Sequence, residues 1–230
     1  MNPEYKEPLF EEAEPTEIEH LGSLAERMVY RLPGCADLMI RMELQNAWYD
    51  FANKTSLLRF DMKAPLVLHQ HRYEFKVPCD AVIKEMRNVR LGCMRPHRHH
   101  RHHYHHFHTW IMGDHIREGL GGHGERPFIE LLFPVDEDLL KHEDTVFCQL
   151  ECRPKMGSEA IPRWIYDKYA DAIVNGAMYR LCSMTGKPWS DAAVATDALR
   201  IYENAMNEAS INAISNNTGK LIATNFEGWA

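Results

Sequence analysis

Residues 161–191 read IPRWIYDKYADAIVNGAMYRLCSMTGKPWSD, and this stretch decides the fold. Along its first part, apolar or small side chains recur at an average step of 3.6 residues, which is typical of one buried helix face. These residues are Ile161, Ile165, Tyr169, Ala172, Gly176 and Tyr179. Gly186 and Pro188 then end the helix, because glycine suits the position after a helix and proline cannot continue one. We expect Ser190 to cap a second helix.

The second helical pattern begins directly after this turn, and its apolar positions also advance by 3.6 residues on average. They are Ala195, Leu199, Tyr202, Met206, Ala209 and Ala213. Two amphipathic helices joined by a short turn bury their apolar faces against each other, so we expect an antiparallel hairpin over residues 154–214. The period is lost beyond it, and residues 215–230 are predicted to form an extended tail.

Helical patterns also occupy residues 16–59 near the start of the chain. The stretch TEIEHLGSLAERMVYRL predicts a helix in which Thr16 and Glu19 form a capping box. A second helix follows, with apolar positions at steps of four, three and four residues. These positions are Ile40, Leu44, Ala47 and Phe51. Residues 1–15 precede both helices and hold three prolines and a run of glutamates, so we interpret them as an acidic flexible arm.

Between the helical regions the period changes to two. Alternating patterns at Tyr73–Val77, Phe128–Leu132 and Val146–Leu150 predict strands, so residues 60–153 form a β-rich region. Cys148 and Cys152 would share one strand face as buried small side chains, because the chain lacks the close Cys/His pairs of a zinc site. The predicted fold class is α+β. Its helical core combines the N-terminal helices with the C-terminal hairpin, and the β-rich region is an insertion with long loops.

The charge distribution limits the classes of function that the chain can have. The net charge is −7, and residues 1–20 hold seven glutamates against one lysine, so the rest is nearly neutral. Such a chain lacks the basic excess of a protein that grips nucleic acid, and DNA that meets it is expected to slide past. The acidic arm is either a partner-binding extension or a solvated tail. With no apolar run or basic leader, we expect a cytosolic origin, reduced cysteines and no membrane span.

Residues 95–108, RPHRHHRHHYHHFH, hold eight of the fourteen histidines, with Arg98, Arg101, Tyr104 and Phe107 set among them at every third position. Three interpretations remain open. The tract is a solvent-exposed loop on the β-rich region. Alternatively, its arginines and aromatic residues contact DNA or another chain. A metal-binding protein is the third interpretation, because neutral imidazoles bind zinc, nickel or copper. The candidate ligands are then His99, His100, His102, His103, His105 and His106.

Enzyme motifs are almost absent, so no catalytic residue and no cofactor is assigned. GLGGHG at 119–124 matches the G-x-G-x-x-G pattern, but a dinucleotide site needs a helix after it. Pro127 and a strand pattern follow instead, so we interpret the glycines as a loop between strands. The acidic residues Asp136, Glu137 and Asp138 lie beside Pro134 and predict a turn.

The hairpin sequence resembles the closing motif of tailed-phage head-to-tail adaptor (connector) proteins. In that motif a strand ends in proline, and Ile/Leu-Pro-x-Trp/Leu, a tyrosine, a Gly-Ala pair and Lys-Pro-Trp-Ser follow. The matching residues here are Pro154, Ile161, Pro162, Trp164, Tyr169, Gly176, Ala177, Leu181, Lys187, Pro188, Trp189 and Ser190. Residues 32–61 and 72–92 resemble the family's opening helix and first strands more weakly. The acidic arm and the histidine tract are not part of the pattern.

The resemblance implies a structural virion protein at the capsid vertex and no catalysis. Family members form a homo-oligomeric ring, usually of twelve copies, below the portal protein. They extend the channel for double-stranded DNA and dock a tail or nozzle protein. A nearly neutral chain suits such a channel wall, because a basic wall would retain the genome. Other phage neck components, such as a stopper or tail terminator, remain alternatives.

Three further expectations concern packing. Gly176 should allow close approach of the two helices of the hairpin. Trp164 and Trp189 are expected to pack in the core, and a role as interface anchors is the alternative for both. The segments at 1–15 and 215–230 are expected to act as straps that become ordered on neighbouring subunits or on the portal.

Overall fold

The computed structural model describes residues 17–74, 80–92, 116–119, 128–132, 134–142 and 144–226. The helices in these ranges are α1 (Gly22–Val29), α2 (Asp37–Thr55), α3 (Glu137–His142), α4 (Arg163–Cys182) and α5 (Ala192–Phe226). The strands are β1 (Ile18–His20), β2 (Arg59–Pro65), β3 (Arg72–Glu74), β4 (Ala81–Gly92), β5 (Ile116–Gly119), β6 (Phe128–Leu131), β7 (Thr145–Pro154) and β8 (Ala160–Pro162). This mixture of helices and antiparallel sheets confirms the α+β class.

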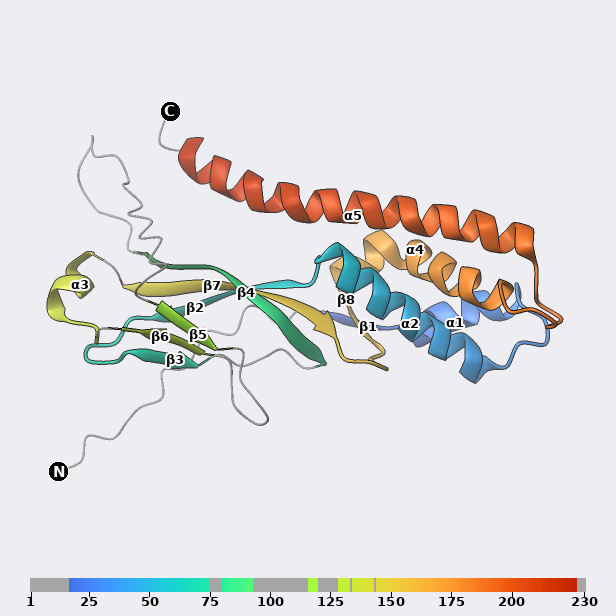
Figure 1. Cartoon of the computed structure of the whole chain (residues 1–230), viewed down its shortest axis with the longest axis horizontal. Helices are drawn as coiled ribbons and strands as arrows, with labels where there is room; N and C mark the ends of the chain where they lie inside the picture. Colours follow the sequence, from blue (N-terminus) through green and yellow to red (C-terminus); the bar gives the residue numbers. More distant parts are fainter. Residues whose placement is uncertain are drawn as a thin grey trace, which may run out of the picture.

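Figure 1 shows an elongated molecule with α1, α2 and α4 at one end and the sheets with α3 at the other. α5 runs along α4 and continues past it toward the strands. α2 packs against both α4 and α5, and the four side chains that the helical period placed inward are fully buried. These are Ile40, Leu44, Ala47 and Phe51.

The described residues form three antiparallel sheets, of which one has the two strands β1 and β8 and the other two have three strands each. β7 is the central strand of the first sheet, with order β2-β7-β4, and β6 is central in the second, with order β3-β6-β5. Cys148 and Cys152 lie buried on the same face of β7 as Val146 and Leu150. On β6, Ile129 and Leu131 are buried, so Phe128 and Leu132, the apolar ends of the predicted alternating pattern, lie on the other face.

The start of the chain folds differently from the prediction. Residues 18–20 form strand β1, which pairs antiparallel with β8 and places Ile18 opposite Pro162. α1 begins only at Gly22, and Glu19 forms an ion pair with Arg163 at 2.6 Å. The predicted capping box is therefore wrong. Glu19 instead lies in a strand that pairs with β8, about 140 positions away along the chain, and no local pattern reveals this pairing.

Two other segments are helical where other structure was predicted. Residues 215–226 belong to α5 and are not an extended tail. Extending an existing helix adds one hydrogen bond for each residue ordered, and this stretch contains no proline. At the predicted acidic turn, Asp136 accepts a hydrogen bond from the Leu139 amide at 2.7 Å through Oδ1 and thereby starts α3.

The turn between α4 and α5 also differs in one detail. Gly186 has a φ of +73°, the left-handed conformation that glycine adopts without strain. The cap of α5 is Asp191, whose Oδ1 accepts hydrogen bonds from the amides of Ala193 and Val194 at 2.9 and 3.0 Å. The predicted cap, Ser190, instead directs its hydroxyl toward the Cys182 carbonyl at 3.5 Å.

We therefore predict that Asp191→Ala lowers the free energy of unfolding by about 1 kcal/mol, because two amides of the first turn lose their acceptor. Ser190→Ala, one residue earlier in the same turn, is the matched control and should change stability by only a few tenths of a kcal/mol. Urea denaturation of both variants measures the difference. A larger loss of stability in Ser190→Ala than in Asp191→Ala would show that Asp191 is not the cap of α5.

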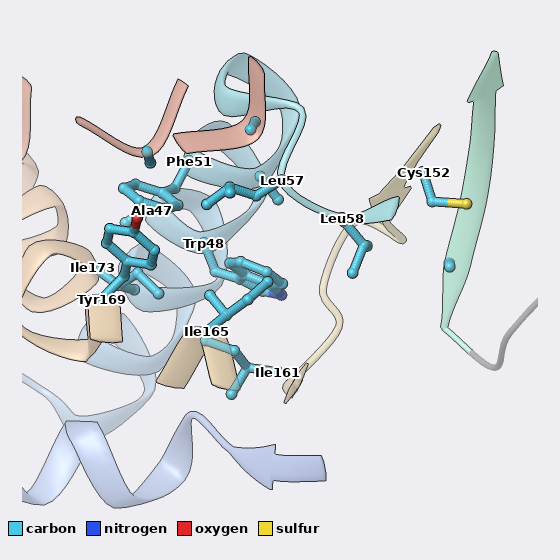
Figure 2. Close-up of a cluster of buried hydrophobic side chains, with 14 of the residues drawn as sticks. Ala47, Trp48, Phe51, Leu57, Leu58, Cys152, Ile161, Ile165, Tyr169 and Ile173 are labelled. Atoms are coloured by element: carbon cyan, nitrogen blue, oxygen red, sulfur yellow. The ribbon is translucent and has the colours of Figure 1, made fainter. Parts of the chain in front are cut away.

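One apolar core connects the helical end to the first sheet. Figure 2 shows Trp48 and Phe51 of α2 beside Ile165 and Tyr169 of α4, with Leu57, Leu58 and Cys152 leading toward the strands. The Trp48 indole Nε1 donates a hydrogen bond to the Ala160 carbonyl at 3.2 Å, which ties α2 to β8. The two ends of the molecule therefore share buried side chains rather than a solvated linker.

Several predicted features lie outside the described residues. They are the acidic arm at 1–15, Phe75 and Val77, the histidine tract at 95–108, and most of the glycine stretch at 119–124. The glycine stretch connects β5 to β6, which pair antiparallel, and the element after it is a strand.

Candidate functional site

The motif residues of the hairpin belong to one continuous structural unit. Pro162 ends β8 and is the N-cap residue of α4, with a φ of −57° that suits the start of a helix. Ala177 lies buried in the middle of α4, and residues 187–190 form the turn that leads into α5. The sequence motif therefore corresponds to a strand, a helix and a turn that are consecutive in space as well as in the chain.

The two helices approach each other closely at Gly176. A Cβ atom at this position would lie 2.7 Å from Cε2 of Tyr202, a distance that real Cβ atoms do not adopt. Tyr202 is buried, and its hydroxyl donates a hydrogen bond to the Ala47 carbonyl of α2 at 2.9 Å. Burial raises the pKa of Tyr202, so the hydroxyl stays protonated and remains a donor. One glycine thus makes room for a side chain that links three helices.

Gly176→Ala is expected to lower the free energy of unfolding by about 1–3 kcal/mol, because the added methyl group overlaps the Tyr202 ring. Helix propensity alone would give the opposite sign, since alanine favours a helix by about 1 kcal/mol over glycine. Thermal and urea unfolding measure the net effect. A stabilised variant would show that the α4–α5 contact is looser than described.

The antiparallel packing of α4 and α5 is secured at its other end by Tyr169. Its ring lies 5.3 Å from that of Phe51, measured between centroids, and its hydroxyl accepts a hydrogen bond from Asn212 at 3.1 Å. Lys168 forms an ion pair with Glu208 at 3.4 Å. Contacts thus run from Lys168 opposite Glu208 to Gly176 opposite Tyr202, so the helices run in opposite directions.

The two motif tryptophans have different environments. Trp189 is partly buried, packs against the core and carries the Lys187 ammonium 6.0 Å from its ring centroid. Its indole Nε1 is buried without a hydrogen-bond partner in the described part of the chain. Trp164 is 46% exposed, so the expectation that it lies in the core is wrong. Trp164 lies in the first turn of α4. Its neighbour Ile165 points into the core, and adjacent residues of a helix point in different directions, so Trp164 faces solvent.

A charged cluster at the junction of helices and sheet was not singled out in the sequence. Glu151, in the middle of β7, is only 2% exposed and accepts hydrogen bonds through Oε1 from Ser56 at 2.5 Å and from Lys84 at 3.0 Å. Its Oε2 lies 3.2 Å from Nη2 of Arg87 and 3.8 Å from Nη2 of Arg59. Four side chains, from strands β2 and β4 and from the loop after α2, therefore converge on a single buried carboxylate.

The cluster also reaches the helices. Lys84 donates to the Asn53 carbonyl at 2.9 Å, at the end of α2, and Arg59 donates to the Ala213 carbonyl of α5 at 3.0 Å. Burial by itself raises the pKa of Glu151, but the hydrogen bonds from Ser56 and Lys84 and the nearby positive charges outweigh it and hold the pKa below its ordinary value. The carboxylate is therefore ionised and acts as a structural anchor between the two ends.

The described part of the chain holds neither a metal-ligand cluster nor a helix that could span a membrane. No group of three or more His, Cys, Asp or Glu residues within it is arranged to hold a metal ion. Burial raises the pKa of the Cys152 thiol to about 12, so this thiol is not a nucleophile at neutral pH. Among the described helices, none combines the length and apolar character needed to cross a membrane. The candidate metal ligands and arginines of the histidine tract lie outside the described residues.

A scan against protein-family models finds no match, and a search of curated proteins finds no similar sequence.

Proposed function

We propose that this chain is a structural virion protein of the head-to-tail adaptor type. In this role, copies of the chain form a ring, of twelve subunits as is usual in that family, below the portal protein at the capsid vertex. The ring extends the channel for double-stranded DNA and docks a tail or nozzle protein. No catalysis and no cofactor is part of the proposal.

The observation that carries the proposal is the agreement between the motif and one structural unit. The motif residues from Ile161 to Ser190 span β8, α4 and the turn into α5, and each buried member has a packing role there. Gly176 and Tyr169 secure the helix pair, and Pro162 begins it. A chance sequence match would not be expected to coincide with the residues that pack the helix pair.

The surface of the helical end supports an assembly role. Large apolar side chains are exposed on α1 and its C-cap, on α2 and at the start of α4. They include Val29, Tyr30, Leu38, Met42 and Trp164. Exposed apolar residues are common singly, but several on adjoining helices are typical of a surface that another protein covers.

The decisive experiment is quantitative mass spectrometry of purified virus particles that contain the protein. A ratio near one copy per portal subunit is expected. Absence from particles would contradict the proposal, and the metal content of the purified chain would then be the next measurement. A ratio far below that of the portal would exclude a full adaptor ring.

Trp164 allows a test at the level of one side chain. Trp164→Glu is expected to weaken association with purified portal rings at least about tenfold, or ~1.4 kcal/mol, because an exposed tryptophan at a contact contributes most when covered. Met156→Glu changes an even more exposed apolar residue, 81% accessible, in the turn before β8 and is the matched control. Native mass spectrometry of chain and portal mixtures measures both. If both variants lose portal association equally, or both retain it, Trp164 is not part of the interface.

A further inference from the structure

Both outer layers of the helical end expose apolar side chains. α2 and α4 each contact α1 and α5, so α1 and α5 lie on opposite sides of them, and the start of α2 lies on the side of α1 (Figure 1). Val29 and Tyr30 are exposed at the end of α1, and Tyr30 is 92% accessible. Leu38 and Met42 are exposed on α2 and share one side of it, because they are four residues apart. We call these four residues the α1–α2 face.

The opposite layer is α5, which exposes Val194, Ile201 and Ile211. Ile211 is 64% accessible, and the other two are each more than one-third accessible. The three are seven and ten residues apart, close to two and three helical turns, so they lie along one side of α5. We call them the α5 face. Apolar side chains exposed on two opposite layers are typical of a chain that other proteins cover on both sides.

The two faces differ in charge. Residues 22–42, which carry the α1–α2 face, hold three arginines and two carboxylates, a net charge of +1. Residues 192–214 of α5 hold three carboxylates and one arginine, a net charge of −2. Most of these groups already form ion pairs within the chain. Arg31 and Glu203 are exposed, and neither has an ion pair with another described residue, so each layer has a charge of opposite sign to offer a partner.

A second copy of the chain is the partner that these two faces fit. It supplies the opposite charge and a second apolar surface at the same concentration as the first copy. Because the faces differ and lie on opposite sides, the contact between copies is heterologous, and a heterologous contact whose rotation closes produces a ring. An isologous dimer would instead set one face, with its net charge, against itself.

We propose that the α1–α2 face of one copy packs on the α5 face of the next copy. The contact gives the proposed adaptor ring its subunit interface, and the inference rests on that proposed function for the closure of the ring. Trp164 belongs to neither face, so the same chain can present it to the portal.

Complementary variants of the full chain test this contact. Leu38→Glu changes only the α1–α2 face and Ile211→Glu only the α5 face, so each alone should weaken self-association at least about tenfold. When they are mixed, each variant still offers the face that the other lacks, and a one-to-one dimer with no larger species is expected. Wild type should form larger assemblies at about 100 μM, where an interface with a Kd of about 10 μM is mostly formed. Native mass spectrometry and sedimentation velocity measure these species.

Met156→Glu, an exposed apolar change outside both faces, is the matched control and should assemble like wild type. Thermal melts confirm that each variant is folded. The proposal is overturned if wild type stays monomeric or if the mixture gives no dimer. It is also overturned if only Leu38→Glu loses assembly, because that result indicates an isologous contact.

Counting the chain in virus particles separates this contact from the adaptor function. A mixed dimer together with absence from particles would contradict only the adaptor role. One copy per portal subunit in particles, without a mixed dimer in solution, would contradict only the contact proposed here.

Discussion

Glu151→Ala is expected to lower the free energy of unfolding by about 3–5 kcal/mol, because it leaves Arg59, Lys84 and Arg87 around a buried site without their common carboxylate. The loss is large because the Arg59 side chain is only 13% exposed and would be left buried without its carboxylate, although Arg87, at 40% exposed, can turn to solvent. Urea denaturation at neutral pH measures it. The cluster also bridges α2, α5 and the first sheet, so the unfolding transition should remain cooperative but shift to lower denaturant.

Glu85→Ala is the matched control for this prediction. Glu85 lies opposite Glu151 on β4 and also pairs with Arg87, at 2.6 Å, but its side chain is 54% exposed. Removing an exposed partner should cost about 0–1 kcal/mol. Equal effects of the two alanine variants would contradict the assignment of Glu151 as the anchor of the junction.

The same carboxylate predicts a pH dependence with a definite sign. The pKa of Glu151 is lowered in the folded state, so the stabilisation is fully present above the ordinary glutamate pKa of about 4.3. It is lost as the pH falls below that value through the folded pKa. Wild type should therefore lose more stability than Glu151→Gln between neutral pH and about pH 3. Parallel pH profiles of the two proteins would contradict this.

Trp48→Ala should destabilise the protein by about 3–5 kcal/mol, the usual cost of truncating a buried aromatic side chain. Trp48 is 1% exposed and packs between α2, α4 and the start of the sheet (Figure 2). The truncation removes its packing area and leaves the Ala160 carbonyl without its indole donor. Thermal unfolding followed by circular dichroism measures the change.

The other tryptophan of this region is the control. Trp164→Ala removes the same number of atoms from a side chain that is 46% exposed, and it should cost less than about 1 kcal/mol. A comparable loss for both variants would place Trp164 in the core after all. A difference of several kcal/mol, together with an assembly defect of Trp164→Glu, would separate folding from assembly at these two positions.

Local patterns in the sequence were sufficient for the long helices and for the strand faces of β7. The 3.6-residue period identified the buried sides of α2, α4 and α5, because a helix face is defined by residues three and four apart. Gly176 was identified as the site of close approach for the same reason. The alternation around Cys148 and Cys152 revealed the buried face of the central strand, since side chains of a strand point alternately to its two faces.

Other features depended on contacts between distant parts of the chain. Residues 18–20 became a strand only because β8, far along the chain, offers them backbone partners. Glu151 had no distinctive signal beyond a charge within an apolar strand, and its role depends on cations from β2 and β4.

The sequence alone determined which residues form the helix pair and which of their faces are apolar, because these properties depend on neighbours a few positions apart. The exposure of Trp164, the capping of α5 by Asp191 rather than Ser190, and the link that Glu151 makes between the two ends of the molecule all follow from the folded arrangement. Burial and ion pairing at these positions arise from elements that meet only in the folded chain.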